Sequence, residues 1–268
     1  MTNTNTHAQR IKFFDPPITE LVVSIYHLPI LELKAQHIGL YWDLIRDRFP
    51  SCEQQTIVVA DGQPFFTEAP GEIFPLPRFW FSSDKSPTLI QIQRNAFMLN
   101  WRRIASEVEY PHYEAVCSDF WREFELYSSF VKDTVKGKID VVQRCELNYV
   151  NWIEPNQFFS SLGDLGAVLP SLAGLKDLAT DNRRLSGLNA AITHRIADNL
   201  FVDLTVRLGH RPDTGTAVLG LELKAHGTPS DLSLPGARAW FDAAHDATYQ
   251  LFLTATSSQF QQAIWRPR

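Results

Sequence analysis

The stretch RFWFSSDKSPTLIQIQRNAFMLNWRR, from Arg78 to Arg103, carries the clearest secondary-structure signal in the chain. It divides into three short strands, separated by a Ser-Asp-Lys-Ser-Pro turn and an Arg-Asn turn. In LIQIQ isoleucines alternate with glutamines, and in AFMLNWR the residues Phe97, Leu99 and Trp101 alternate with Met, Asn and Arg. A period of two predicts antiparallel strands with one core face and one polar face.

The segments on either side of this stretch complete a first unit. A β-branched run between prolines predicts a strand at 18–27, and apolar residues at helical spacing predict a helix at 32–49. Residues 51–77, which contain four prolines and two glycines, predict a connection with one short strand at 56–59. After Tyr110-Pro111-His112, an aromatic stripe at 113–131 predicts a long amphipathic helix.

The same order of elements then begins again. The pattern predicts, in order, a strand at 140–153, a short helix after Glu154-Pro155-Asn156, a Gly/Leu-rich loop at 163–174, strands at about 185–196, 200–208 and 216–226, and a helix at about 235–265.

This recurrence predicts an α+β fold built from duplicated β-α-β-β-β-α halves. The halves are residues 13–136 and 137–268, after a polar lead of residues 1–12 that we expect to be disordered. They would form one antiparallel sheet backed by two long helices, with a TBP-like saddle and a helix-grip sheet as the shapes to compare. Two unrelated α+β domains with a similar order of elements remain the alternative.

Composition excludes several classes of protein. A hydrophobic content of 44% suffices for a large core, and a net charge of -5 disfavours a general affinity for nucleic acid. The three cysteines are far apart and never spaced as Cys-x-x-Cys, which fits a reducing cytoplasm and indicates neither a disulfide framework nor a thiolate zinc site. The N-terminus has no apolar export signal and no apolar run reaches the roughly 20 residues of a membrane span, so we expect a soluble protein.

Motifs for nucleotide binding, serine hydrolysis and metalloprotease chemistry are missing from the sequence. His210 and His226 flank one hairpin but lack further ligands at metal spacing. Asp242 and His245 lie three residues apart on the last helix, as a base and its orienting group would, although a surface pair is the simpler interpretation. We therefore assign no catalytic residue, metal or cofactor, and the sequence favours a protein that is not an enzyme.

Other reactive side chains have structural interpretations. Cys117 and Cys145 are read as small buried hydrophobic residues. The charged residues Asp119, Glu123 and Glu125 are expected on the solvated side of the long helix at 113–131.

Several blocks resemble a family of sporadically distributed bacterial proteins of about 250 residues. They are PPITELVVSIYHLP near the start, PRFWFSS, the block QIQ-x3-F-x2-NWR, Tyr110-Pro111-His112-Tyr113, and the closing helix with His245 and Trp265. The resemblance covers nearly the whole chain and is most specific in the QIQ block. It brings no assigned activity and no catalytic residues. The scattered distribution of this family implies an accessory cytoplasmic role, as in a bacterial defence or toxin–antitoxin locus.

Three functions follow as hypotheses. The first is a non-catalytic module that binds a protein encoded nearby through the polar sheet face, with a homodimer left open. The second is a small-ligand-binding protein or enzyme, with a pocket between the sheet and a long helix lined by Trp101, Tyr127, Trp152 and His245. The third, which the acidic charge disfavours, is nucleic-acid binding on the sheet face. A solvated antiparallel face is the simpler interpretation of these polar positions. As a contact surface, the polar face would present Gln91, Gln93, Asn100, Arg102, Arg144, Asn148 and Arg207.

Overall fold

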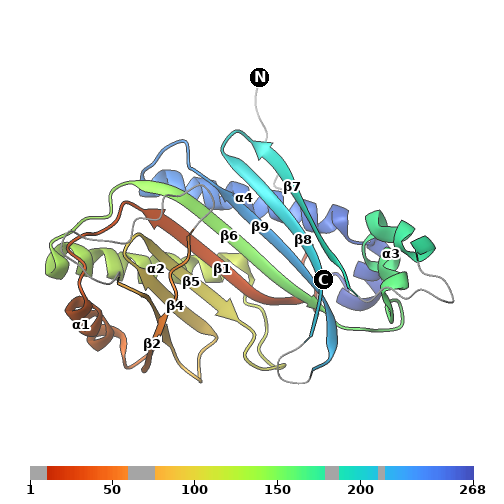
Figure 1. Ribbon diagram of the computed structural model, residues 1–268, viewed down its shortest axis with the longest axis horizontal. Coiled ribbons are helices and arrows are strands. Elements are labelled where there is room, and N and C mark those ends of the chain that lie inside the picture. Colours follow the sequence, from red (N-terminus) through yellow and green to blue (C-terminus); the bar gives the residue numbers. More distant parts are fainter. Residues whose placement is uncertain (1–10, 60–75, 179–186, 211–214) are drawn as a thin grey trace.

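A nine-stranded antiparallel sheet forms the body of the protein, with its two long helices on the same face (Figure 1). This computed structural model describes residues 11–59, 76–178, 187–210 and 215–268. The strands lie in the order β2-β3-β4-β5-β1-β6-β9-β8-β7. Their bounds are β1 Ile18–His27, β2 Ser51–Gln55, β3 Arg78–Ser82, β4 Thr88–Gln93, β5 Ala96–Arg102, β6 Val142–Ile153, β7 Asn189–Ala197, β8 Leu200–His210 and β9 Ala217–Gly227.

The two halves of the chain have matching connectivity. They meet where β1 pairs with β6, and from that seam the strands run outward as β1-β5-β4-β3 and β6-β9-β8-β7, with β2 added to the first half. Each half ends in a long helix, α2 (His112–Phe130) or α4 (Leu234–Ala255). The α+β class with a single antiparallel sheet is therefore confirmed, and its symmetry is the arrangement that a duplication would produce.

Shorter helices complete each half. Helix α1 (Ala35–Ile45) follows β1, and α2 continues into a π-helical turn at Val131–Val135. Between β6 and β7 lie a 3-10 turn at Leu162–Asp164, helix α3 (Leu165–Val168) and a 3-10 segment at Pro170–Leu178, while α5 (Ser258–Phe260) and a π-helical turn at Gln261–Trp265 follow α4.

The stretch from Arg78 to Arg103 forms β3, β4 and β5, as its alternation predicted. In the β4–β5 hairpin Ile92 pairs with Phe97, and both side chains are fully buried. The Phe97 ring stacks on Tyr127 of α2, with centroids 5.3 Å apart. Burial of aromatic side chains in offset contact stabilises each such pair by about 0.5–1.5 kcal/mol beyond the area term, so this hairpin and α2 hold the first core together.

Four predicted elements differ in the structure. The short helix expected directly after Glu154-Pro155-Asn156 is replaced by a turn that a β-bridge between Asn156 and Phe159 closes, and helical turns begin only at Leu162. The edge strand of the first half is Ser51–Gln55 rather than 56–59. It pairs with β3 at a solvent-exposed edge of the sheet, where low β-propensity does not prevent polar residues from forming a strand. The loop expected at 163–174 contains helical turns. The last helix ends at Ala255 because Thr256 is extended, and Ser257 then caps a new turn by accepting a hydrogen bond from the Phe260 amide.

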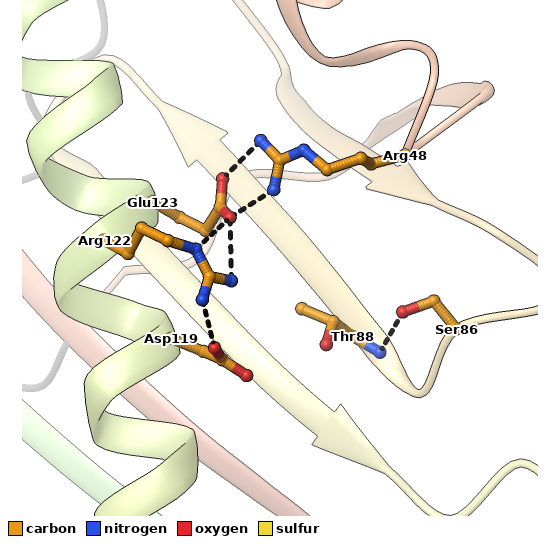
Figure 2. A network of polar contacts seen from close by, with 6 residues as sticks. All are labelled: Arg48, Ser86, Thr88, Asp119, Arg122 and Glu123. Carbon is orange, nitrogen blue, oxygen red and sulfur yellow. Dashed lines mark hydrogen bonds and ion pairs between the residues drawn. The ribbon is translucent and has the colours of Figure 1, made fainter.

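Glu123 of α2 is buried rather than solvated, with 1% of its surface exposed. Arg48, just beyond α1, binds both of its carboxylate oxygens, and Arg122 approaches the same carboxylate at 3.2 Å (Figure 2). Arg122 also binds Asp119 at 2.6 Å. Because a buried carboxylate needs compensating charge, this network ties the end of α1 to the middle of α2.

Parts of four predicted features lie outside the described residues. They are most of the lead at 1–12, positions 60–75 of the connection, the first two positions of the strand expected at 185–196, and the turn at 211–214. Among the described residues, no helix is both long enough and apolar enough to cross a membrane.

Candidate ligand cavity and the polar sheet face

The polar face is the side of the sheet opposite α2 and α4, and three of its predicted contact residues are buried. Gln91, Gln93 and Asn100 have exposed fractions of 4%, 2% and 5%. Trp80 Nε1 donates to Gln91 Oε1 at 2.9 Å, Gln91 Nε2 donates to Asn100 Oδ1 at 2.6 Å, and Asn100 Nδ2 donates to Glu20 Oε1 at 2.7 Å. Across β3, β4, β5 and β1, these amides are therefore committed to hydrogen bonds within the protein.

Gln93 holds residues 56–59 against this face. The Val58 amide donates to Gln93 Oε1 at 3.0 Å, and Gln93 Nε2 donates to the Val58 carbonyl at 2.9 Å. The Val58 side chain packs against Tyr26, Ala96 and Met98. The β-branched residues at 56–59 therefore pack on the polar face of the sheet and do not form a strand within it.

The other four predicted contact residues are more accessible. Arg102, Arg144 and Asn148 are half-buried, and Arg207 is exposed. Asn148 Nδ2 donates to the Glu222 carboxylate at 2.7 Å, and Arg207 binds the second oxygen of the same carboxylate. The accessible part of the polar face therefore lies toward β8 and β9.

The four residues of the predicted pocket are brought together only in part. Tyr127 is fully buried in the core, and Trp101 contacts the ring of Tyr110 with centroids 5.2 Å apart. Trp152 lies on the polar face because side chains alternate along β6, where it pairs with Gly220. His245 does line a cavity between the sheet and α4.

This cavity has a volume of about 140 Å³. One wall is the sheet, with Tyr149 and Asn151 of β6, and the facing wall is α4, with His245 and Thr248. The start of α2 and the segment 11–18 form further sides, and the cavity remains partly open to solvent. Most of the lining is aromatic or aliphatic, which suits a small molecule whose surface is mainly apolar.

The segment 11–18 is tied to both α4 and the C-terminal residues. The Ile11 amide donates to the Tyr249 hydroxyl at 2.7 Å. Phe13 forms a β-bridge with Pro267, and its ring packs on Phe252 and Trp265. This wall is therefore fixed by contacts with residues more than 200 positions away in sequence.

A polar cluster occupies one end of the cavity. The Tyr149 hydroxyl and His245 Nδ1 lie 2.7 Å apart, at hydrogen-bond distance, and a hydrogen bond also links Tyr149 to Tyr110. The ring of Tyr113 stacks on His245 with centroids 4.0 Å apart, and its hydroxyl donates to Asp242 at 3.1 Å. Tyr113 thus connects the two residues, Asp242 and His245, that the sequence singled out as a pair.

Burial keeps the phenols of this cluster protonated. It raises the pKa of Tyr110, Tyr113 and Tyr149, and the neighbouring Tyr110 further raises the pKa of Tyr149. Burial and the nearby Lys12 charge lower the pKa of His112, which favours its neutral form. These groups accordingly act as neutral hydrogen-bonding groups near neutral pH.

The backbone of His112 and the side chain of Thr248 are both energetically unfavourable features of this site. His112, at the start of α2, has a positive φ of 70°, a conformation that costs energy for a residue with a Cβ. Thr248 is 2% exposed, and its hydroxyl has no hydrogen-bond partner among the residues that the structure describes. Asn151, by contrast, donates its amide to the Leu221 carbonyl at 3.0 Å.

The remaining histidine candidates lie elsewhere. His226 Nε2 lies 3.1 Å from Asp203 on the polar face. His210 is at the opposite end of the β8–β9 pair, since it pairs with Ala217 whereas His226 pairs with Phe201. Within the described part of the chain, no group of three or more His, Cys, Asp or Glu residues is placed to hold a metal ion.

No protein-family model, curated protein or solved structure matches the chain significantly. The resemblance to sporadically distributed bacterial proteins accordingly stays a prediction, and the cavity is interpreted from its own residues.

Sequence reasoning identified His245 but missed its partners. Tyr110 was noted only in the lead into a helix, and neither Tyr149 nor Thr248 was singled out. The signal that was present is a cluster of tyrosines and histidines at 110–113, which the sheet brings to His245. No local pattern indicates that segment 11–18 forms a side of the cavity, because its contacts depend on the C-terminal residues.

Proposed function

We propose that this chain is a non-catalytic small-ligand-binding protein, with its site in the cavity between the sheet and α4. The observation that carries this proposal is a cavity of about 140 Å³ whose mainly apolar walls end in the cluster of Tyr110, Tyr149 and His245. Mostly apolar cavities with a few convergent polar groups are the usual form of small-molecule sites. An engineered apolar cavity of similar volume, about 150 Å³, binds benzene.

The chemistry of the polar cluster supports binding rather than catalysis. Its tyrosines have raised pKa values, so they stay protonated near neutral pH and serve as hydrogen-bond donors rather than as general bases. His245 already shares a hydrogen bond with Tyr149, which orients its ring. Such a cluster fixes the orientation of a ligand without requiring a nucleophile. The free state of all three cysteines supports placing this function in the cytoplasm.

Cavity-filling substitutions test the proposal. Leu221 and Leu223 of β9 lie on the same face and are both fully buried, but only Leu223 is among the residues that line the cavity. We expect Leu223→Phe to extend into the cavity with little loss of stability, whereas Leu221→Phe overpacks the core and costs about 1–3 kcal/mol. Urea denaturation measures both.

A ligand screen completes this test. Small aromatic and aliphatic fragments are screened against the wild-type chain by ligand-observed NMR. Fragments that bind the wild type are expected to lose binding to Leu223→Phe. If no fragment binds, or if every bound fragment also binds Leu223→Phe unchanged, the cavity is not a ligand site.

A protein-binding role for the polar face is the second candidate, and one observation favours it. Arg207 is exposed beside Glu222, where it presents charge on an otherwise internally bonded surface. Such a surface fits a partner encoded nearby, as in a defence or toxin–antitoxin locus. Capture of the tagged chain from its host would recover a stoichiometric protein that is lost on Arg207→Glu and kept on Arg46→Glu, an exposed position at the end of α1 on the other side of the sheet. Equal recovery by both variants would remove this candidate.

A further inference from the structure

Strand β7 forms one free edge of the sheet (Figure 1). Its inner side pairs with β8, and next to this pairing the Leu208 amide donates to the Leu188 carbonyl at 3.1 Å. This bond fixes the phase of the strand, because successive residues of an antiparallel strand direct their N–H and C=O groups to opposite sides. The even-numbered positions from 188 to 194 therefore bond to β8, and the backbone groups that point outward belong to Asn189, Ala191, Thr193 and Arg195.

These outward backbone groups form no hydrogen bond to any residue that the structure describes. A row of unpaired amides and carbonyls on an edge strand is a template for pairing with another strand. The opposite edge is protected, since β2 is five residues long, mainly polar and carries Glu53. Strand β7 is nine residues long and carries two exposed isoleucines, Ile192 and Ile196.

Ile192 lies on the helix face of the sheet. It pairs with Leu204 of β8, which is buried in the core of the second half, and residues directly opposite each other in a sheet share a face. The long helix α4 packs over β6, β9 and β8, and Ile192, one strand further out, is 53% exposed. Unpaired backbone groups and an exposed apolar side chain therefore coincide on one edge.

A second copy of the same strand would satisfy both in one register. When two β7 strands pair antiparallel about a two-fold axis beside Ile192, this residue faces itself in a non-hydrogen-bonded pair, in which side chains approach most closely. Ala191 then exchanges hydrogen bonds with Thr193 of the second copy, and Asn189 with Arg195 of the second copy. All the outward-pointing residues are used, and no like charges lie opposite each other.

Other registers fit less well. Moving the two-fold axis to Thr193 keeps the phase of the backbone groups but places Ile192 opposite His194 of the second copy. The apolar contact between the two copies of Ile192 would then be lost. The register centred on Ile192 is therefore the one that the strand favours.

We propose that the chain forms a symmetric dimer in which two β7 edges join the sheets of both copies into one. The contact is isologous, so pairing occupies the β7 edge of each copy and assembly stops at the dimer. A single pair of strands buries less than the roughly 1,600 Å² of a standard interface, so the dimer should dissociate at micromolar concentrations. No β7 residue lines the cavity between the sheet and α4 in the described structure, and the dimer is therefore independent of ligand binding.

A charge swap at Ile192 tests both the interface and its register. Ile192→Lys and Ile192→Glu each place two like charges on the axis, whereas a mixture of the two variants places opposite charges there. The control is Leu44→Lys, which changes an exposed leucine on α1, in the other half of the sheet. Sedimentation equilibrium over a range of protein concentrations gives the dissociation constant, and circular dichroism shows that each variant is folded.

We expect the wild type and Leu44→Lys to dimerise equally. Each Ile192 variant alone should dimerise at least about 10-fold more weakly, because like charges placed together in an interface repel, and an equal mixture of the two should recover a dimer. Amide exchange of the wild type tests the same pairing without a substitution. Exchange at Ala191 and Thr193 should slow as protein concentration rises, while the Ile192 amide, which faces β8, is protected throughout.

Three results would overturn the proposal. A wild type that stays monomeric at every concentration excludes the dimer, and slow exchange at Ala191 and Thr193 in that monomer would show that another segment of the chain covers the edge. A dimer that Ile192→Lys leaves intact forms through another surface. Variants that are monomeric alone and also when mixed exclude the register with Ile192 on the axis.

Discussion

Thr248→Val should stabilise the unliganded protein. Valine matches threonine in shape, in χ1 stiffness and nearly in helix propensity, so the substitution changes little besides the hydroxyl. That hydroxyl is 2% exposed and has no hydrogen-bond partner among the described residues. Since an unsatisfied buried hydroxyl costs about 1–3 kcal/mol, its removal should raise the free energy of unfolding by about 1–2 kcal/mol.

Urea denaturation at equilibrium measures this effect, with Thr254→Val as the matched control. The hydroxyl of Thr254 is exposed and already bonded to the Gln250 carbonyl, so its loss should change stability by less than about 0.5 kcal/mol. A thermal melt should show the same order, since each 1 kcal/mol corresponds to about 2–4 °C in a chain of this size.

A loss of stability in Thr248→Val, or a change equal to that of the control, would refute the reasoning. Either result would mean that the hydroxyl has a hydrogen-bond partner in solution, such as a water molecule.

Two further predictions concern buried charge. Arg48→Ala leaves the buried Glu123 carboxylate with Arg122 alone and should cost about 2–3 kcal/mol in urea denaturation, less than a fully buried pair because 46% of the Arg48 side chain is exposed. Arg46→Ala, which breaks an exposed pair, should cost under about 0.5 kcal/mol, and equal losses would show that the Glu123 network adds no stability. Burial lowers the pKa of His27 from 6.5 to about 4, so the folded state binds a proton more weakly than the unfolded state. The stability this provides is complete above about pH 6.5 and declines toward pH 4 by about 3 kcal/mol. His27→Asn should flatten the profile of unfolding free energy over that range, and an unchanged slope would show that other groups cause it.

The fold was largely predictable because its signals are local. Alternation in the stretch from Arg78 to Arg103 specified β3, β4 and β5, and the aromatic stripe after Pro111 specified α2. The edge strand β2 was not predictable, because its polar sequence SCEQQ pairs with β3 at a solvated edge and carries no period of its own.

On the polar face, periodicity predicts the side of the sheet on which a residue lies but not the groups that it contacts. Alternation correctly placed Gln91 and Asn100 away from the helices, but it cannot say whether such residues meet solvent or each other. Their bonds to Trp80 and Glu20 come from strands β3 and β1, so the network depends on the order of strands in the sheet. Burial raises the pKa of Glu20, while the hydrogen bond from Asn100 partly offsets this effect.

The candidate site was predictable only through His245. The helical stripe placed that residue against the sheet, but its hydrogen bond to Tyr149 joins positions 96 residues apart. The same holds for segment 11–18, whose contacts with Trp265 and Pro267 place it along the cavity. Contacts of this range follow from the tertiary fold and leave no local pattern.

The central claim is that a small molecule binds between the sheet and α4. The most direct measurement labels the leucine methyl groups of the chain with ¹³C, assigns Leu223 through Leu223→Ile, and titrates the chain with a fragment that binds in the ligand screen. Leu223 lines the cavity, whereas Leu89 of β4 lies on the polar face. The account predicts saturable shifts and ligand contacts at the Leu223 methyls, with Leu89 unchanged. Shifts confined to other leucines, or no saturable shift at Leu223, would contradict it.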